Sequence, residues 1–360
     1  MYCNWRAPSH KKKSRIFIKI TSLFFTLIWM LPTTAAEEKI LNIYNWANYM
    51  PKQVLKKFSK QTGIHINYSE FDSNETLYAK LKSNPNIGYD LVVPSNYYIP
   101  RMIREHLIQP INLNRIPNYR WIKPYLLHRH FDPKNRFSIP YSWGITGIAV
   151  NRRYHPNDTI NRWQDFWRPQ YRNQLLILND MRGAFNIALI TLGYSINDKN
   201  KAHIYQAYLK LKALMPNIKL FNSDAEQNIY VDADATIGMG WNGDIYQAQQ
   251  ENKNIDFIFV KDHFILWIDS FVLCENAPHP NNAHLFLNFI NQPEIAAEIA
   301  LYNGYSSPNN GAIARLPKAQ RDNPTFNPPM QLLKRAELEE DVGEAIQWYQ
   351  KYWYQLKLLG

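Results

Sequence analysis

The chain has 360 residues, 46% of them apolar, and its 41 Lys and Arg residues against 30 Asp and Glu residues give a formal net charge of +11. This composition excludes a collagen-like chain and a disordered one. Most of the excess positive charge lies in residues 1–36, and no dense Lys/Arg cluster follows them, so no nucleic-acid partner is expected.

Residues 1–36 have the three parts of a secretory signal peptide. A basic stretch ending in KKKSR is followed by the apolar run 16–31 and by the small residues TTAA before Glu37. An uncleaved membrane anchor is the alternative, but the run contains Lys19 and is shorter than the roughly 20 apolar residues that span a bilayer. We therefore expect cleavage after Ala36 and a soluble, exported mature protein.

The mature chain is expected to fold without covalent or metal crosslinks. Only Cys274 remains after cleavage, which excludes an intrachain disulfide and a Cys-based zinc or iron–sulfur site. The remaining length exceeds what one hydrophobic core usually supports, so the sequence predicts two lobes.

The first part of the mature chain predicts a βαβαβ unit, because short apolar runs alternate with segments of helical periodicity. The expected strands are 41–44, 64–68 and 90–94, and the expected helices are 51–61 and 76–82.

A second α/β set is expected to begin near residue 147. Its expected strands are 175–178, 235–239, 255–260 and 266–273, and its expected helices are 180–192 and 204–215. The Pro- and Asn-rich stretch 303–329 predicts an irregular return crossing, before a last helix over 342–358.

Ligands of open α/β sheets bind outside the carboxyl ends of the strands. In this chain the residues at those positions are mostly aromatic or acidic, in both halves. They are Trp46, Asn48 and Tyr49 after the first strand, Ser95, Tyr97 and Tyr98 after the third, Asp180 after Leu178, Trp241 and Asp244 after Met239, and Trp267 and Asp269 within the last long strand.

This mixture of side chains suits an elongated organic cation, because aromatic faces attract cations and alkyl chains and a carboxylate neutralises an ammonium group. Trp267 and Asp269 are two residues apart and share one face of their expected strand. An unpaired Asp on an apolar strand is costly, which makes Asp269 a candidate ligand residue. The alternative for each residue alone is a core aromatic or a helix-capping acid.

With these residues the chain resembles a known family, the periplasmic spermidine/putrescine-binding proteins, which deliver polyamines to ATP-driven (ABC) importers. The resemblance runs over nearly the whole mature length, in the order and near the spacing of the family. It rests on YNWANYMP at 44–51, NETLYAKLKS at 74–83, YDLVVPSNYY at 89–98, SIPYSWG at 138–144, LGYS at 192–195, GMGWNGD at 238–244, WIDS at 267–270 and DVG at 341–343.

The resemblance implies a two-lobed α/β periplasmic-binding-protein fold of type II, with the ligand cleft between lobes joined by a hinge. By this likeness the N-terminal lobe comprises residues 37–146 and 268–315, and the C-terminal lobe comprises 147–267 and 316–360. It also implies a monomer that is not an enzyme, without cofactor or metal, whose partner is the permease/ATPase complex of an importer.

The resemblance also implies the ligand-binding residues. Trp241 and Trp267 would flank the methylene chain, while Asp180 and Asp269 would meet the amine groups. The full set is Trp46, Asn48, Tyr49, Ser95, Tyr97, Asp180, Trp241, Asp244, Trp267, Asp269, Tyr305 and Glu339.

Several positions depart from the spermidine-binding branch. Asn48 and Gly183 stand where that branch has acids, whereas Asp244 matches the putrescine-binding branch and Glu339 replaces a Gln. The chain thus fits neither branch, and a protein that binds both spermidine and putrescine is favoured.

Other interpretations remain open from the sequence. Residues 238–243 match G-x-G-x-x-G, although Trp241 would obstruct a pyrophosphate. His128 and His130 suggest a metal site without an evident third ligand. Asp180 and Asp269 could form a glycosidase pair. A sensor that docks on a receptor instead of a transporter would have the same ligand site.

Overall fold

A computed structural model describes residues 1–8 and 37–359, and the residues from Glu37 onward form a unit of their own. The predicted signal peptide therefore lies, apart from residues 1–8, outside the described residues. Within these two ranges, no helix has both the length and the apolar character that crossing a membrane requires.

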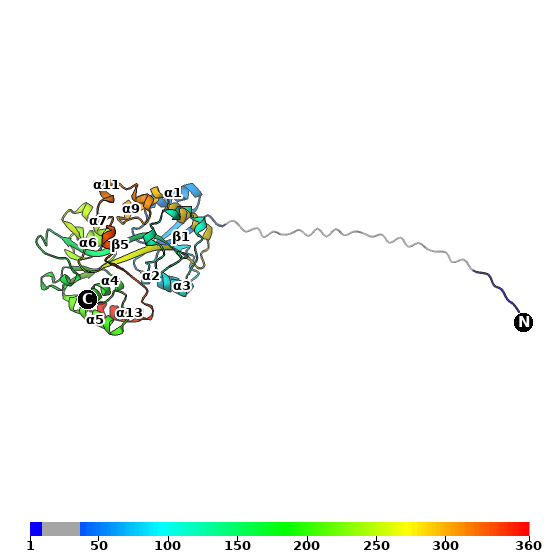
Figure 1. Ribbon diagram of the computed structural model, residues 1–360, viewed down its shortest axis with the longest axis horizontal. Coiled ribbons are helices and arrows are strands. Elements are labelled where there is room, and N and C mark those ends of the chain that lie inside the picture. Colours follow the sequence, from blue (N-terminus) through cyan, green and yellow to red (C-terminus); the bar gives the residue numbers. More distant parts are fainter. Residues whose placement is uncertain (9–36, 360) are drawn as a thin grey trace. The chain divides into compact units, whose positions relative to one another are not determined.

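The fold alternates strands and helices along the chain (Figure 1). The strands are β1 (Ile40–Trp46), β2 (His65–Phe71), β3 (Leu91–Val92), β4 (Ile108–Gln109), β5 (Ser138–Asn151), β6 (Leu175–Ile177), β7 (Ile218–Phe221), β8 (Ile237–Trp241), β9 (Ile255–Ile258), β10 (Phe264–Cys274) and β11 (Ala336–Leu338). The α-helices are α1 (Lys52–Thr62), α2 (Asn74–Ser83), α3 (Ile99–Arg104), α4 (Met181–Thr191), α5 (Lys201–Leu214), α6 (Glu226–Val231), α7 (Asn242–Glu251), α8 (Pro280–Ile290), α9 (Pro293–Asn303), α10 (Asn310–Ile313), α11 (Lys318–Arg321), α12 (Met330–Leu333) and α13 (Ile346–Lys357).

The predicted βαβαβ unit is confirmed, because β1 pairs in parallel with both β2 and β3. The second set has the same character, since β6 pairs in parallel with β7 and β8. The strand order is β2-β1-β3-β10-β5-β8-β6-β7. Both sets therefore place the carboxyl ends of their parallel strands next to connecting loops that can carry a ligand site.

Two long antiparallel strands, β5 and β10, connect the two sets. One part of β10 pairs with β3 and β4, while one part of β5 pairs with β8 and β9. The lobe boundaries expected at residues 146/147 and 267/268 fall within these two strands. The assignment of the lobes to those residue ranges stays a prediction.

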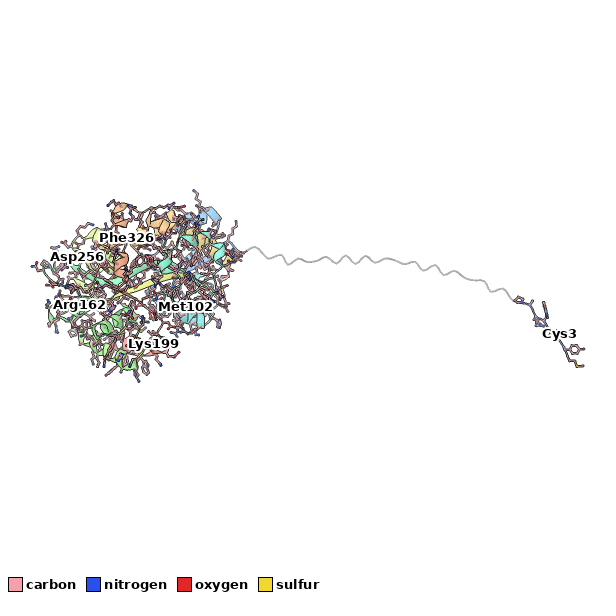
Figure 2. The ribbon with its side chains drawn as sticks, in the orientation of Figure 1. Cys3, Met102, Arg162, Lys199, Asp256 and Phe326 are labelled. Atoms are coloured by element: carbon pink, nitrogen blue, oxygen red, sulfur yellow. The ribbon has the colours of Figure 1, made fainter. Side chains whose placement is uncertain are left out.

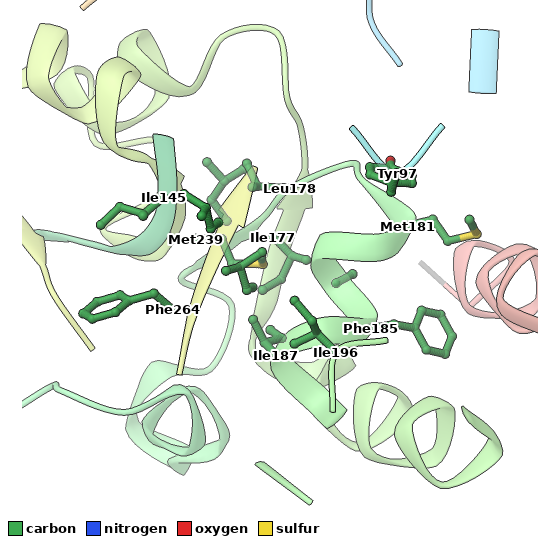
Figure 3. Close-up of a cluster of buried hydrophobic side chains, with 14 of the residues drawn as sticks. Tyr97, Ile145, Ile177, Leu178, Met181, Phe185, Ile187, Ile196, Met239 and Phe264 are labelled. Atoms are coloured by element: carbon green, nitrogen blue, oxygen red, sulfur yellow. The ribbon is translucent and has the colours of Figure 1, made fainter. Parts of the chain in front are cut away.

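Buried apolar side chains form three separate clusters among the described residues. The first includes Ile177 of β6, Met239 of β8 and Phe185 of α4 (Figure 3), where α4, α5 and α13 pack against one another. The second lies under β1, α1 and α8. A small third cluster contains Phe326, labelled in Figure 2, which packs edge-on against Tyr246 of α7.

The structure corrects the expectation for residues 303–329. This stretch is not wholly irregular, because α10 and α11 lie within it, and Asn309 caps α10 by accepting a hydrogen bond from the Ala312 backbone N–H at 3.0 Å. The last helix, expected to begin at residue 342, begins at Ile346 after a 3₁₀ turn.

Candidate functional site

One cleft gathers all twelve residues that the sequence analysis assigned to ligand binding, from Trp46 on β1 to Glu339 after β11, whereas Tyr98 is not among its lining residues. Its empty volume is about 980 Å³, part of it open to solvent. Further lining residues are Ala47, Phe71, Asp72, Ser73, Asn74, Glu75, Thr146, Asn179, Gly183, Ser223, Asp224 and Asn303. A role for any of these side chains in binding stays a prediction.

The topology explains why residues so distant in sequence converge. Trp46 ends β1, Asp180 directly precedes α4, and Trp241 ends β8, so each stands at the carboxyl end of a parallel strand. Asp269 comes from β10, where an isolated bridge joins it to Ser95 and a register shift follows. Trp267 lines the same cleft, as expected for strand residues two apart.

Asp269 is a buried carboxylate that two side-chain hydroxyl groups bind. It is 3% exposed, and its two oxygens accept hydrogen bonds from the Ser95 hydroxyl at 2.7 Å and the Tyr49 hydroxyl at 2.9 Å. Both donors are neutral, so burial dominates and raises the pKa of Asp269 to about 7 despite these bonds. A cation in the cleft would supply the missing counter-charge.

Asp244 lies in the first turn of α7, where the positive end of the helix dipole favours a carboxylate. The Tyr305 hydroxyl donates a hydrogen bond to it. Burial raises the pKa of Asp244 to about 6. Gly243 makes this pairing possible, because a Cβ there would lie 2.4 Å from ring carbons of Tyr305. Packing against Tyr305 thus accounts for Gly243, the last glycine of the G-x-G-x-x-G match, without a dinucleotide.

Asp180 caps α4, and one of its oxygens accepts hydrogen bonds from the backbone N–H groups of Arg182 at 2.9 Å and Gly183 at 3.3 Å. Burial nevertheless raises its pKa. Nearby, Glu339 is 4% exposed and accepts a hydrogen bond from Asn186 at 2.5 Å. Burial and the negative charge of Asp180 raise the pKa of Glu339 to about 8, although Arg182 opposes them.

Aromatic rings form a continuous wall of the cleft. Ring centroids are 5.1 Å apart for Trp267 and Tyr305, 5.7 Å for Tyr305 and Tyr49, and 6.4 Å for Tyr49 and Trp46. The Trp46 indole is fixed by a hydrogen bond of 2.8 Å to the carbonyl of Val93. Such a wall offers apolar and cation-attracting faces together.

The sequence analysis missed three acids of the cleft: Asp72, Glu75 and Asp224. Glu75 receives a hydrogen bond from the Tyr98 hydroxyl at 3.1 Å, while burial and the negative charge of Asp180 raise its pKa to about 7. Asn74, also missed, donates hydrogen bonds to Ser95 at 3.0 Å and Tyr97 at 3.1 Å. An acid near the start of a helix resembles an ordinary capping residue, so the sequence gave no distinct signal.

The lining of the cleft is strongly one-sided in charge. It contains seven carboxyl groups, and none of its described residues is Lys, Arg or His. Over residues 1–8 and 37–359, no group of three His, Cys, Asp or Glu side chains is arranged to hold a metal ion. The carboxylates are instead spread along an aromatic wall, which fits a long organic molecule with several positive charges.

Comparison with known proteins agrees with this geometry. Residues 53–327 match the family model of bacterial extracellular solute-binding proteins. The spermidine/putrescine-binding periplasmic protein of Salmonella typhimurium is 38% identical over 96% of this chain and 99% of its own. The putrescine-binding periplasmic protein PotF of Escherichia coli is 32% identical over 82% of this chain and 85% of its own.

The fold agrees as well. The solved structure of the spermidine/putrescine ABC transporter substrate-binding protein PotD from Streptococcus pneumoniae superposes with a TM-score of 0.76 at 32% identity, covering 89% of this chain and 98% of that one. The two-lobed α/β fold expected from the sequence is confirmed by this neighbour. The chain therefore belongs to the bacterial extracellular solute-binding proteins, in the family that contains the periplasmic spermidine/putrescine-binding proteins.

Proposed function

We propose that this protein captures polyamines, spermidine and putrescine, in its acidic aromatic cleft and delivers them to an ABC importer from the periplasm. The family consists of substrate-binding transport proteins and not of enzymes, so a glycosidase role for Asp180 and Asp269 is set aside. The relatives are named as periplasmic proteins and as parts of ABC transporters, and the sensor alternative is not favoured.

The observation that carries the proposal is the charge of the cleft. The cleft lining holds seven carboxyl groups and no basic side chain, so these groups would repel one another in the ligand-free protein, and burial raises the pKa of several of them although Arg182 lies near Asp180 and Glu339. A polyamine brings one ammonium group for each of several carboxylates, and its methylene chain matches the aromatic wall. A monovalent cation or a neutral sugar would leave most of these charges unpaired.

In this proposal, Trp241 and Trp267 flank the methylene chain, and Asp269 and Asp180 receive amine groups. Asp269 keeps two neutral donors, which fix its orientation without neutralising it. The lobes, divided within β5 and β10, would close on the ligand as a monomer and present it to the permease.

Calorimetric titration of the mature protein, freed of ligand by unfolding and refolding, tests the proposal. Putrescine, cadaverine, spermidine and spermine are titrated in turn. We expect one-to-one binding of spermidine and putrescine. Absence of heat with all four ligands, from a protein whose circular dichroism shows refolding, would contradict it.

The Gly183→Glu variant is expected to shift the preference toward the longer ligand. Gly183 lies in the first turn of α4, and a Cβ there would meet Asp180 Oδ2 at 3.3 Å, a contact that a small side-chain movement can relieve. A carboxylate at this point adds a partner for a further amine. We expect the ratio of spermidine to putrescine affinity to rise about tenfold, as one charged hydrogen bond allows.

The matched control is Gly183→Gln, which has nearly the same shape without the charge. If this affinity ratio rises equally in both variants, the effect is due to side-chain shape and not to charge. If the ratio is unchanged in Gly183→Glu, a side chain at position 183 does not contact the ligand.

The Gly243→Ala variant is expected to weaken polyamine binding about 10- to 100-fold, because the added methyl group would displace the Tyr305 ring and its hydrogen bond to Asp244. Gly88→Ala is the control: a Cβ there meets nothing within 4 Å, although φ is +87° and some backbone strain results. Titration of spermidine into both variants checks this. Equal affinities of Gly243→Ala and Gly88→Ala would show that binding does not require Tyr305 in its present position.

A further inference from the structure

Glu226, the first residue of α6, is a buried acid that does not line the cleft. It is 2% exposed, and one carboxyl oxygen accepts a hydrogen bond from the backbone N–H of Trp241 at 3.2 Å. Its other oxygen, Oε1, has no hydrogen-bond partner among the described residues. No Lys, Arg or His of the described chain forms an ion pair with it. The proposed function gives this side chain no role.

The charged groups that act most strongly on Glu226 are acids. The Trp241 N–H that Glu226 accepts belongs to the N-cap of α7, the helix that packs against α6 and carries Asp244 in its first turn. Asp224 precedes α6 in the chain, Asp180 is the N-cap of α4, and the negative charges of all three acids act on Glu226. The phenols of Tyr230 and Tyr305 also lie near it. The strands beside α6 add nothing basic, since β5 and β8 contain no Lys, Arg or His.

The rest of α7 does not compensate Glu226 either. Its other acid, Glu251, stands at the far end of the helix, is exposed and receives a hydrogen bond from Gln227. Burial and the negative charge of Asp244 therefore raise the pKa of Glu226 well above its ordinary value. Two buried carboxyl groups at the same helix N-terminus, whose negative charges act on each other without an ion-paired cation, lose their protons in two steps that belong to the pair.

We propose that Glu226 and Asp244 share one proton in the ligand-free protein, and that an ammonium group arriving at Asp244 releases this proton to solvent. The arriving positive charge stabilises the second carboxylate, and no bond other than the O–H bond of the carboxyl group breaks. Glu226 is thus a positioning residue that acts through Asp244 without touching the ligand. This inference rests on the proposed function of the cleft.

Proton release makes capture depend on pH. Affinity rises with pH wherever binding releases protons, and each released proton adds one unit to the slope of the logarithm of the association constant against pH. Asp269 and the other cleft acids contribute to this slope as well. The contribution of the Glu226–Asp244 pair to this slope is measured with Glu226→Gln. This variant keeps the shape of the side chain and leaves Asp244 without an acidic partner at position 226.

The experiment is calorimetric titration of spermidine into the mature protein at several pH values between 5.5 and 8.5, in buffers of different ionisation enthalpy. We expect the wild-type protein to release up to about one proton per ligand more than Glu226→Gln, with a correspondingly steeper rise of affinity with pH. The matched control is Glu251→Gln, expected to behave as wild type. Glu226→Asp, which restores an acid, is expected to recover part of the release.

Equal proton release and equal slopes in wild type and Glu226→Gln, both binding spermidine, would overturn the inference. Absence of spermidine binding by the wild-type protein at every pH would instead overturn the proposed function. Binding by Glu226→Gln at pH 8.5 shows that this variant is folded, so a lost proton signal cannot be assigned to misfolding.

Discussion

The Asp269→Asn variant is expected to lose polyamine affinity by about 100- to 1000-fold. A buried ammonium would lose its counter-charge, and breaking a buried ion pair by removing one partner costs roughly 3–5 kcal/mol. Asn keeps the size of the side chain and an oxygen that can accept from Ser95 or Tyr49, so the fold around β10 is retained.

Titration of spermidine and putrescine into Asp269→Asn checks this expectation. Asp234→Asn is the control, because Asp234 is exposed in the turn before β8 and lies outside the cleft lining. An affinity for Asp269→Asn within about threefold of wild type, a difference of less than 1 kcal/mol, would refute the assigned role of Asp269. The ligand-free variant is also expected to be at least as stable as wild type above pH 7, since it buries one charge fewer.

The free energy of unfolding of the ligand-free protein is expected to fall by several kcal/mol as pH rises from about 4 to 8. Burial raises the folded-state pKa of Asp244 to about 6, of Glu75 and Asp269 to about 7, and of Glu339 to about 8. Between their unfolded and folded pKa values these groups bind more protons in the folded state, so stability decreases with pH. This contribution is fully present below the unfolded values and is lost through the folded ones.

Denaturant unfolding at pH 5 and pH 8, with and without saturating spermidine, measures this effect. Spermidine is expected to stabilise the protein more at pH 8, where more of the carboxylates are ionised and need its charges. Stability that rises from pH 5 to pH 8 in the absence of ligand would show that the cleft acids are already ionised and compensated by other means.

Much of the site could be predicted because its residues follow strands with clear apolar runs. Asp180 follows the end of β6 by three residues, and Trp241 ends β8, so the rule that ligands bind at strand ends identified them. Tyr305 and Glu339 were identified through the family resemblance alone, and Ser95, although it follows the third strand, was assigned to ligand binding only through that resemblance. No local pattern marks a residue whose position depends on a distant strand, as Ser95 depends on β10.

The long strand β5 was not predicted, because Pro140, Gly144 and Gly147 weaken a strand pattern. The structure supplies the reason for Gly144: a Cβ there would lie 2.4 Å from the Trp267 ring and 2.3 Å from the Asn242 amide oxygen. This glycine thus makes room for a wall of the cleft, which only the tertiary packing reveals. The sequence analysis also made no prediction for α8 and α9, although Pro280 and Pro293 occupy their first positions.

The acids Glu75, Asp224 and Glu226 escaped notice for a related reason. Each lies at or beside the start of a helix, where an acid ordinarily stabilises the helix dipole in contact with solvent. Only the packing shows that Asp180 lies near Glu75 and that Asp244 and Asp224 lie near Glu226. The sequence therefore predicted an acidic cleft but underestimated its charge.

The central claim, that the cleft selects its ligand by paired positive charges on an alkyl chain, is tested most directly by comparing putrescine with butane-1,4-diol. The two molecules have the same chain and nearly the same shape, but the diol has no charge. Calorimetric titration of the mature protein at pH 7.5 is expected to give one-to-one binding of putrescine and no measurable binding of the diol. Comparable binding of both would contradict the account, because the seven carboxyl groups of the cleft would then not determine what it holds.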